Sequence, residues 1–459
     1  MSSTSQPHIE QQLETSRLSR RSLVSLSLAS FIPAVGMGML PVLMLSLAGP
    51  TAWLSATVAA VLVICIGRSV ITFARRYVGT GSLYSYIQEV FGSWARYLTA
   101  AALMVSFVAQ VGGVAATVGI FGGSFLEGRG VNDALGPVVQ TVLLVAAIVV
   151  AGVVAYRGVD TSVRVAVTLA AVSVPLMAVI TVASALHTGL DLGQQFDAQQ
   201  FSIGGALKGV AAGAAWLVGF ESCAAMAAET KNPTRNVPMA VMSVPVVLGT
   251  TYVVTTILQV PGLLAAEGRL SAGTSAPAAL AEQAGLGSAV GAATDLVLAV
   301  ASFAALIGFT NYGSRIAMAI SEDGLLPAWV GAVHPRFHSP HRAVVALLIL
   351  GFATIFALLL STGDIVKAYS MIAPLVVYGC VAPYVLVSVG SVLVSRRVRE
   401  LSPTVVVAAT IGGAGMIWVY LNGWINPPAP PTDVTVWVAI VVLAVMTAFI
   451  GLRHRRSAA

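Results

Sequence analysis

The chain has 459 residues, of which 57% are hydrophobic and only 9% are charged, and its net charge is +6. Water-soluble domains carry about 25% charged residues, so the composition excludes an ordinary soluble globular protein. The mean hydropathy of +0.89 predicts an all-α integral membrane protein. The basic residues are scattered along the chain, which excludes the compact basic face that binds nucleic acid.

Apolar runs long enough to cross a bilayer as helices, about 20 residues each, alternate with polar or Gly/Pro-rich turns. We expect about twelve transmembrane helices, at 23–47, 51–73, 93–122, 137–155, 162–186, 204–228, 237–260, 287–314, 343–360, 368–394, 402–422 and 434–452.

The distribution of lysine and arginine predicts the orientation in the membrane. Residues 1–22 are polar and are expected to form a cytoplasmic tail, not a cleavable signal peptide, and 453–459 would form a second tail. With the N-terminus inside, the outer side carries four of the 24 basic residues: Arg129, Lys208, Arg269 and Lys367. The positive-inside rule therefore predicts a multi-pass protein of the cell (inner) membrane with both termini in the cytoplasm.

The first span carries two glycines, Gly36 and Gly38, between Pro33 and Pro41. In a helix interior, glycine costs about 1 kcal/mol relative to alanine and proline about 3 kcal/mol. We therefore expect this helix to be interrupted at the glycines. The alternative is that the glycines let neighbouring helices approach closely.

The sixth span reads Ala215-Trp216-Leu217-Val218-Gly219-Phe220-Glu221-Ser222 and is also expected to be interrupted. A carboxylate inside a span costs about 2.5–3.5 kcal/mol on insertion scales. Glu221 is therefore our candidate for a proton-coupling group; the alternative is a structural carboxyl that ties the helix to its neighbours. Free N–H groups at half-helix ends attract anions and free carbonyls attract cations, so paired interruptions predict a transporter's central site.

Five further residues have two interpretations each. Asp295 either attracts an amine or pairs with a base, or it lies at a wet interface. Trp216 and Phe220 are aromatic gates or packing residues. Gln110 binds substrate or a neighbouring helix, and Arg68 either has a functional role or extends toward the headgroups.

Four motifs occur in order along the chain. They are Gly36-Met37-Gly38, then Gly79-Thr80-Gly81-Ser82-Leu83-Tyr84-Ser85-Tyr86, then Gly219-Phe220-Glu221-Ser222 with Lys231-Asn232-Pro233 and Arg235-Asn236-Val237-Pro238, and finally Arg315 with Glu322-Asp323-Gly324-Leu325-Leu326-Pro327. Together they resemble the amino acid–polyamine–organocation superfamily, of the amino acid permease type.

The resemblance implies a LeuT-like fold of two inverted five-helix repeats, at 23–186 and 204–394, with two peripheral helices at 402–452. It implies that an amino acid or related organic amine binds between the interrupted helices. The substrate carboxylate would contact N–H groups around Gly36, Met37 and Gly38. Its amino group would face carbonyls around Val35 and Val218–Gly219. Met39 and the aromatic Phe309 would complete the pocket.

Two positions depart from the family pattern. Met37 is bulkier than the small residue that relatives have between the glycines. The fifth helix has no lysine where many proton-coupled relatives carry one, and the matching position falls near Ser173. A hydroxyl cannot replace a bound cation, so the coupling mechanism does not carry over from those relatives.

The sequence therefore predicts a secondary active transporter that works by alternating access, with proton-coupled uptake and sodium as an alternative coupling ion. An exchanger of amino acids or polyamines is the rival interpretation. The sequence shows no Ser/His/Asp grouping, phosphate loop or paired carboxylates, so we expect no enzyme activity, cofactor or metal. The expected partners are the substrate, the coupling proton and the lipid bilayer, without nucleic acid.

Overall fold

The computed structural model describes residues 13, 16–271 and 273–458. Over this part of the chain the structure is helical, and its extended pairing is limited to one isolated bridge between Leu18 and Thr230. Most of the predicted N-terminal tail lies outside the described residues. The helix predicted to begin near residue 23 begins at Arg20.

The helical elements in chain order are α1 (Arg20–Ala29), α2 (Pro33–Ala48), η2 (Gly49–Thr51), α3 (Ala52–Ala74), α4 (Leu83–Gln88), α5 (Ser93–Glu127), α6 (Pro137–Tyr156), α7 (Val159–Thr188), α8 (Leu192–Gln195), η3 (Ala198–Gln200), α9 (Ile203–Ala215), η4 (Phe220–Glu229), α10 (Pro233–Ser243), η5 (Val244–Leu248), α11 (Gly249–Ala265), α12 (Glu267–Ser271), α13 (Ala276–Gln283), α14 (Ser288–Glu322), η6 (Ala328–Gly331), α15 (His341–Thr362), α16 (Ile365–Arg397), α17 (Pro403–Ile425), η7 (Thr432–Val434) and α18 (Thr435–Ala458).

Eleven helical segments of the described chain are long and apolar enough to cross a membrane, where the sequence predicts about twelve. The difference arises in the first segment, Arg20–Ala74, which has 55 residues, whereas one crossing needs about 20. This segment contains α1, α2 and α3. The other ten agree with the remaining predicted spans to within a few residues at most ends, although several helices extend further. α18, for example, continues to Ala458 through the predicted C-terminal tail.

The first span is interrupted at Ser30–Ile32, so the predicted break at Gly36–Gly38 is wrong by about one and a half to two helical turns. Proline is tolerated as the first residue of a helix, and the residue before a proline avoids the right-handed helical conformation. Pro33 accordingly starts α2, and Ile32 has a φ of 42°. Both glycines lie inside the continuous helix α2.

The sixth span is interrupted where the sequence predicts. α9 ends at Ala215, and η4 begins at Phe220 after a connection that ends in Gly219. Gly219 has a φ of 89°, a conformation that glycine adopts without a side-chain clash. The two interrupted helices are neighbours, because α2 packs against α9.

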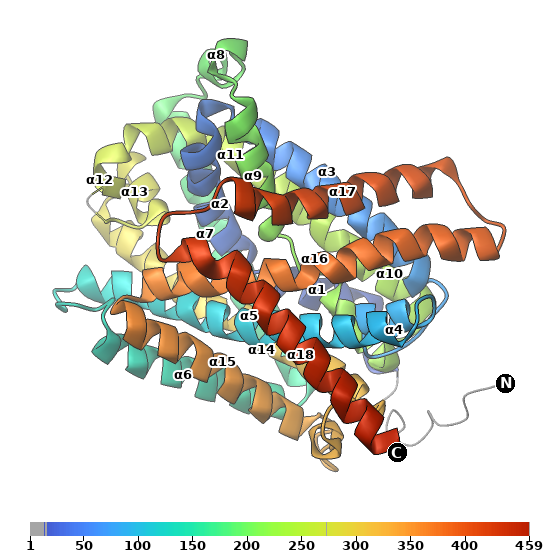
Figure 1. The fold of residues 1–459 in the computed structure, drawn as a ribbon. Helices are drawn as coiled ribbons and strands as arrows, with labels where there is room; N and C mark the ends of the chain where they lie inside the picture. The colour runs from blue at the N-terminus through green and yellow to red at the C-terminus, as the bar shows by residue number, and fades with distance from the viewer. Residues whose placement is uncertain (1–12, 14–15, 272, 459) are drawn as a thin grey trace.

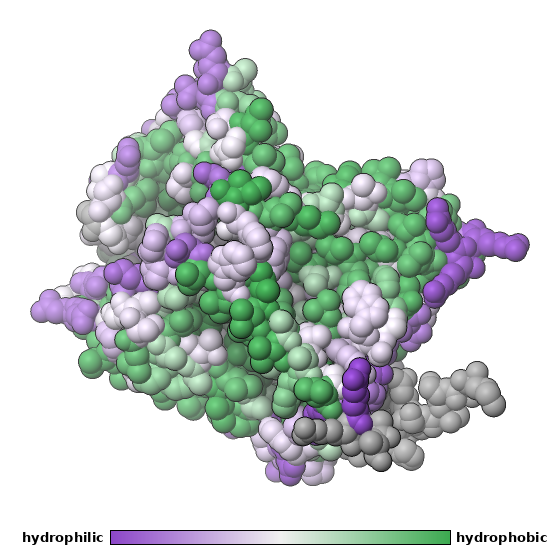
Figure 2. Space-filling view, in the orientation of Figure 1, coloured by the Kyte–Doolittle hydropathy of each residue, from purple (hydrophilic) through white to green (hydrophobic). Residues whose placement is uncertain are grey.

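The centre of the bundle is formed by α5, which packs along both α14 and α16. α17 and α18 lie on the outside of this group, and α18 crosses the front of the view in Figure 1. Figure 2 shows apolar residues over the middle of this face and hydrophilic residues at tips such as α8 and the α16–α17 connection. An apolar surface of this kind is expected where lipid surrounds the helices.

Candidate functional site

A cavity of about 820 Å³ lies between the two interrupted helices. It reaches from the interruption at Ser30–Ile32 along α2 to Leu47, and its mouth includes Lys208 and the loop residues Pro427–Pro428. Its volume is in the range of pockets for small ligands, about 300–1,000 Å³. The cavity therefore opens at the end of the bundle where α2 ends and where α17 and α18 are connected.

The interrupted helices leave backbone groups unpaired at and next to the floor of the cavity. Among the described residues, the carbonyl oxygens of Ser30, Phe31 and Val218 accept no backbone hydrogen bond, and the N–H of Ala34 donates none. Ser30, Phe31 and Val218 line the cavity. The floor thus presents the negative ends of two helices, α1 and α9, close to the positive end of α2.

The structure divides the twelve predicted site residues into two groups. Six of them line the cavity: Val35, Met39, Gln110, Trp216, Val218 and Phe309. Six others do not: Gly36, Met37, Gly38, Gly219, Phe220 and Glu221. Phe31, which the sequence analysis did not select, also lines the cavity and packs edge-on against Phe309 with ring centroids 5.3 Å apart.

The two glycines of α2 lie at helix contacts. A Cβ on Gly36 would lie 2.2 Å from the hydroxyl of Tyr252, and one on Gly38 would lie 2.7 Å from Pro277. No real Cβ tolerates such distances, so both positions allow the close approach that small residues give in membranes. The carbonyl oxygen of Met37 accepts a hydrogen bond from Gln259 at 2.9 Å.

Glu221 lies behind the cavity floor with 1% of its surface exposed. The hydroxyl of Tyr384 donates to its carboxylate at 2.5 Å and accepts from the N–H of Gly219 at 2.7 Å. The hydroxyl of Ser82 donates to the backbone oxygen of Glu221 at 3.1 Å. Glu221 thus connects the interrupted sixth span to α16 and to the loop before α4.

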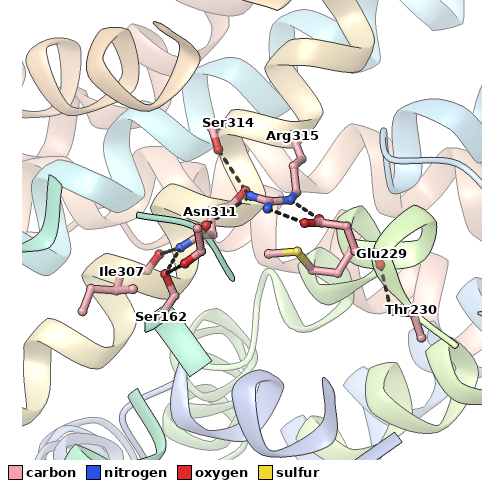
Figure 3. Close-up of polar contacts among 9 residues, drawn as sticks. Ser162, Glu229, Thr230, Ile307, Asn311, Ser314 and Arg315 are labelled. Atoms are coloured by element: carbon pink, nitrogen blue, oxygen red, sulfur yellow. Dashed lines mark hydrogen bonds and ion pairs between the residues drawn. The ribbon is translucent and has the colours of Figure 1, made fainter. Parts of the chain in front are cut away.

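On the side away from its mouth, the cavity is backed by a buried ion pair between Glu229 and Arg315, shown in Figure 3. Their side chains are 3% and 0% exposed, respectively. Arg315 also donates to the backbone and side-chain oxygens of Asn311, and Asn311 donates to Ser162 at 3.0 Å. The network therefore joins the end of η4 to α14 and α7.

Two further contacts close the same end of the bundle. Leu18 donates its N–H to the oxygen of Glu229 at 2.8 Å, and its own oxygen accepts from Lys231 at 2.9 Å. The hydroxyl of Tyr84 donates to Asp323 at 2.5 Å. Segments far apart in the sequence, including three of the four motifs, therefore meet beneath the cavity.

The remaining sequence candidates lie elsewhere. Asp295 is buried and accepts hydrogen bonds from Ser124 at 2.7 Å and Ser275 at 2.6 Å; it neither lines the cavity nor has a basic partner among the described residues. Arg68 lines a second cavity at the other end of the bundle. No group of three His, Cys, Asp or Glu side chains in the described chain could hold a metal ion.

Sequence reasoning missed Tyr384 and the pairing of Glu229 with Arg315. Tyr384 lies 163 residues from its partner, and nothing in its own segment distinguishes it from other aromatic residues of apolar helices. The ion pair could have been suspected from the sequence. Glu229 and Arg315 are opposite charges at the ends of apolar stretches, and such charges inside a membrane protein usually pair with one another.

Helical segments of membrane-spanning length around a cavity define a multi-pass membrane protein. A family model described as amino acid permease matches residues 18–446, nearly the whole chain. The chain therefore belongs to the amino acid permease family, whose members are transporters and not enzymes.

Three relatives illustrate the range of the family. The chain is 25% identical to the branched-chain amino acid permease BcaP of Bacillus subtilis, over 83% of this chain and 82% of the relative. It is 24% identical to the methylthioribose transporter of Bacillus subtilis, over 79% and 78% of the two chains. It is 27% identical to an uncharacterized transporter of Mycobacterium tuberculosis, over 69% and 68%.

Proposed function

We propose that this permease is a secondary active transporter that takes up a neutral amino acid with an apolar side chain by alternating access. The observation that carries the proposal is that both helix interruptions meet at the floor of one cavity. Interrupted helices in this arrangement form the substrate site of many secondary transporters.

The backbone at the floor matches the two charged groups of an amino acid. The unpaired carbonyls of Ser30, Phe31 and Val218 suit an ammonium group. The free N–H of Ala34, a buried residue between the lining residues Ile32 and Val35, suits a carboxylate at the N-terminus of α2. This placement moves the carboxylate site about one turn from Gly36–Gly38 toward the start of the helix. Helix ends would then hold the substrate backbone, while side chains select its R group.

The walls favour an apolar R group. Val35, Met39, Trp216 and Phe309 line the cavity, and Lys208 at the mouth is the one charged side chain among the described lining residues. A cationic side chain would find no carboxylate there, although burying a charge requires a partner. The name of the relative BcaP, a branched-chain amino acid permease, agrees with this substrate class.

The two ends of the bundle differ in a way that fits one state of an alternating-access cycle. The cavity is open at one end, whereas the Glu229–Arg315 pair and the pairing of Leu18 with Glu229 and Lys231 close the other. We infer that the open end faces outward, because Lys208 is one of few basic residues there and both termini would then lie in the cytoplasm.

The proposed topology has twelve crossings, with α2 and α3 crossing separately. The turn Gly49–Thr51 divides the first apolar segment at a suitable place for this. Two inverted five-helix repeats, at 23–186 and 204–394, would place the first and sixth spans in corresponding positions. Helices at 402–452 would stay peripheral, and α17 and α18 do pack on the outside of α16.

Proton coupling is proposed with Glu221 as the coupling group, because it is a buried carboxyl adjoining the floor. Its hydrogen bond with Tyr384 connects this carboxyl to α16, so that a change in its protonation would act on that helix.

An exchanger remains the second candidate, and vesicle loading distinguishes the two. Proton symport responds to an imposed pH gradient in empty vesicles, whereas exchange requires internal substrate.

The test is uptake of labelled leucine into proteoliposomes, together with the Tm of the purified protein. We expect leucine, isoleucine or valine to raise the Tm, because binding to the folded state stabilises it. Ala212→Trp, which fills the cavity, should abolish the shift and uptake. Ala146→Trp, on the exposed face of α6, is the matched control and should preserve both. If no neutral amino acid changed the Tm, the proposed substrate class would be wrong.

A further inference from the structure

A second cavity, of about 330 Å³, lies at the closed end of the bundle, between the last turns of α3 and α16 and the start of α17. Its lining includes three arginines: Arg68 of α3, and Arg75 and Arg76, which directly follow the last residue of that helix. Arg68 is half-buried and lies about two turns before the end of the helix, whereas Arg75 is exposed. The cavity is separate from the proposed substrate site and shares no lining residue with it.

Only one of the three guanidinium groups has a carboxylate partner in the described chain. Arg76 pairs with Glu400 and donates to the backbone oxygen of Thr72 at 2.6 Å. Arg68 donates to the hydroxyl of Thr72 at 3.0 Å, and Arg75 forms no ion pair with any residue that the structure describes. The lining therefore carries a positive charge that the described part of the chain does not neutralise.

The end of α3 accounts for Arg76 but not for Arg68. A basic side chain at a helix C-terminus is stabilised by the free carbonyls of the last turn, and Arg76 makes such a contact. Arg68 lies before that turn, and its guanidinium contacts a hydroxyl beside the cavity instead. A guanidinium group in this position suits a phosphate, because it offers several donors in a planar fork.

Exposed apolar side chains lie close in sequence to two residues that line this cavity, Glu400 and Val405. Val398, Leu401, Val406 and Val407 of the α16–α17 connection and of α17 are 44%, 38%, 38% and 56% exposed, respectively. Figure 2 shows this connection as a hydrophilic tip beside apolar helix surfaces. A basic cavity next to exposed apolar residues matches the two parts of a phospholipid, its headgroup and its acyl chains.

We propose that Arg68, Arg75 and Arg76 bind a phosphate group, and that in the membrane this group belongs to an anionic phospholipid. The headgroup phosphate occupies the cavity, and the acyl chains lie against the apolar residues of α17. The lipid joins α3 to α16 and α17 at the end of the bundle that the Glu229–Arg315 pair closes. The proposal does not depend on which substrate the permease carries.

The test uses the full-length protein in nanodiscs of phosphatidylcholine, with or without phosphatidylglycerol, and counts retained lipids by native mass spectrometry. Phosphatidylglycerol should remain bound and raise the Tm. Arg68→Gln with Arg75→Gln should weaken its binding about 30-fold, since each juxtamembrane arginine contributes about fivefold. Arg164→Gln, an exposed arginine of α7 near the same end, is the matched control and should bind as the native protein does.

A lysine pair, Arg68→Lys with Arg75→Lys, separates loss of charge from loss of folding, because it should restore most of the binding. Inorganic phosphate added to phosphatidylcholine nanodiscs tests whether the site binds a free phosphate ion and not the phosphate of a lipid headgroup. Equal stabilisation by inorganic phosphate would overturn the lipid assignment. Equal binding of phosphatidylglycerol by the native protein and the glutamine pair would overturn the site itself.

Discussion

Replacing Glu229 by glutamine is expected to destabilise the closed end of the bundle, because it leaves Arg315 buried without its counter-charge. The side chain of Arg315 is fully buried and that of Glu229 is 3% exposed. Removing one partner of a buried ion pair costs about 3–5 kcal/mol. We expect a loss of this size in the free energy of unfolding.

Glu282→Gln is the matched control, since Glu282 pairs with Arg269 at 3.2 Å with side chains 30% and 43% exposed. Exposed pairs contribute about 0–1 kcal/mol. Glu282→Gln should therefore lower the free energy of unfolding by at least threefold less than Glu229→Gln does.

A double variant separates the ion pair from the packing around it. Changing Glu229 and Arg315 together to methionine removes both buried charges and should recover most of the loss, as in other proteins whose buried pairs were replaced by apolar residues. Unfolding would be followed by circular dichroism during denaturant titration of the detergent-solubilised protein. The reasoning is refuted if Glu229→Gln costs no more than Glu282→Gln, or if the double variant is as unstable as Glu229→Gln alone.

Two substitutions test the packing and hydrogen bonds around the floor. Gly36→Ala should cost about 1–3 kcal/mol, because its Cβ would lie 2.2 Å from the hydroxyl of Tyr252; an unchanged Tm would contradict this close contact. Tyr384→Phe should cost about 1–3 kcal/mol, because it leaves the Glu221 carboxylate and the Gly219 N–H without this partner. It should also alter the pH dependence of uptake if Glu221 couples to protons, and an unaltered pH profile would count against that role.

The sequence predicts the helices well because membrane insertion is mainly a local property. A run of about 20 apolar residues is required wherever the chain crosses, and this requirement can be read without knowing the fold. The interruption of the sixth span also depends on a local feature of the sequence, because Gly219, with a φ of 89°, lies at the predicted place. The first span is interrupted before Pro33, which starts the helix, and not at Gly36 and Gly38, because glycine weakens a helix much less than proline does.

The candidate site could be predicted only in part. Val35, Met39, Gln110, Trp216, Val218 and Phe309 line the cavity, but whether a residue faces it depends on how each helix is rotated against its neighbours. Gly36 illustrates the point, because it lies one position after Val35 and packs against Tyr252 instead. Successive residues of a helix point in different directions, so sequence proximity to an interruption does not decide exposure to the cavity.

By itself, the sequence determined that this protein is a helical membrane protein, where nearly all its spans lie, and that two spans are interrupted. Each of these follows from the cost of placing polar groups, glycine or proline in apolar helical surroundings. Only the tertiary structure decided that Glu229 meets Arg315 across 86 residues and that Tyr384 meets Glu221 across 163. It also decided that three arginines, two of them without a carboxylate partner among the described residues, meet at a cavity between α3, α16 and α17. These contacts depend on how distant helices pack, because a charge or hydroxyl in an apolar interior is stable only beside the partner that the fold brings to it.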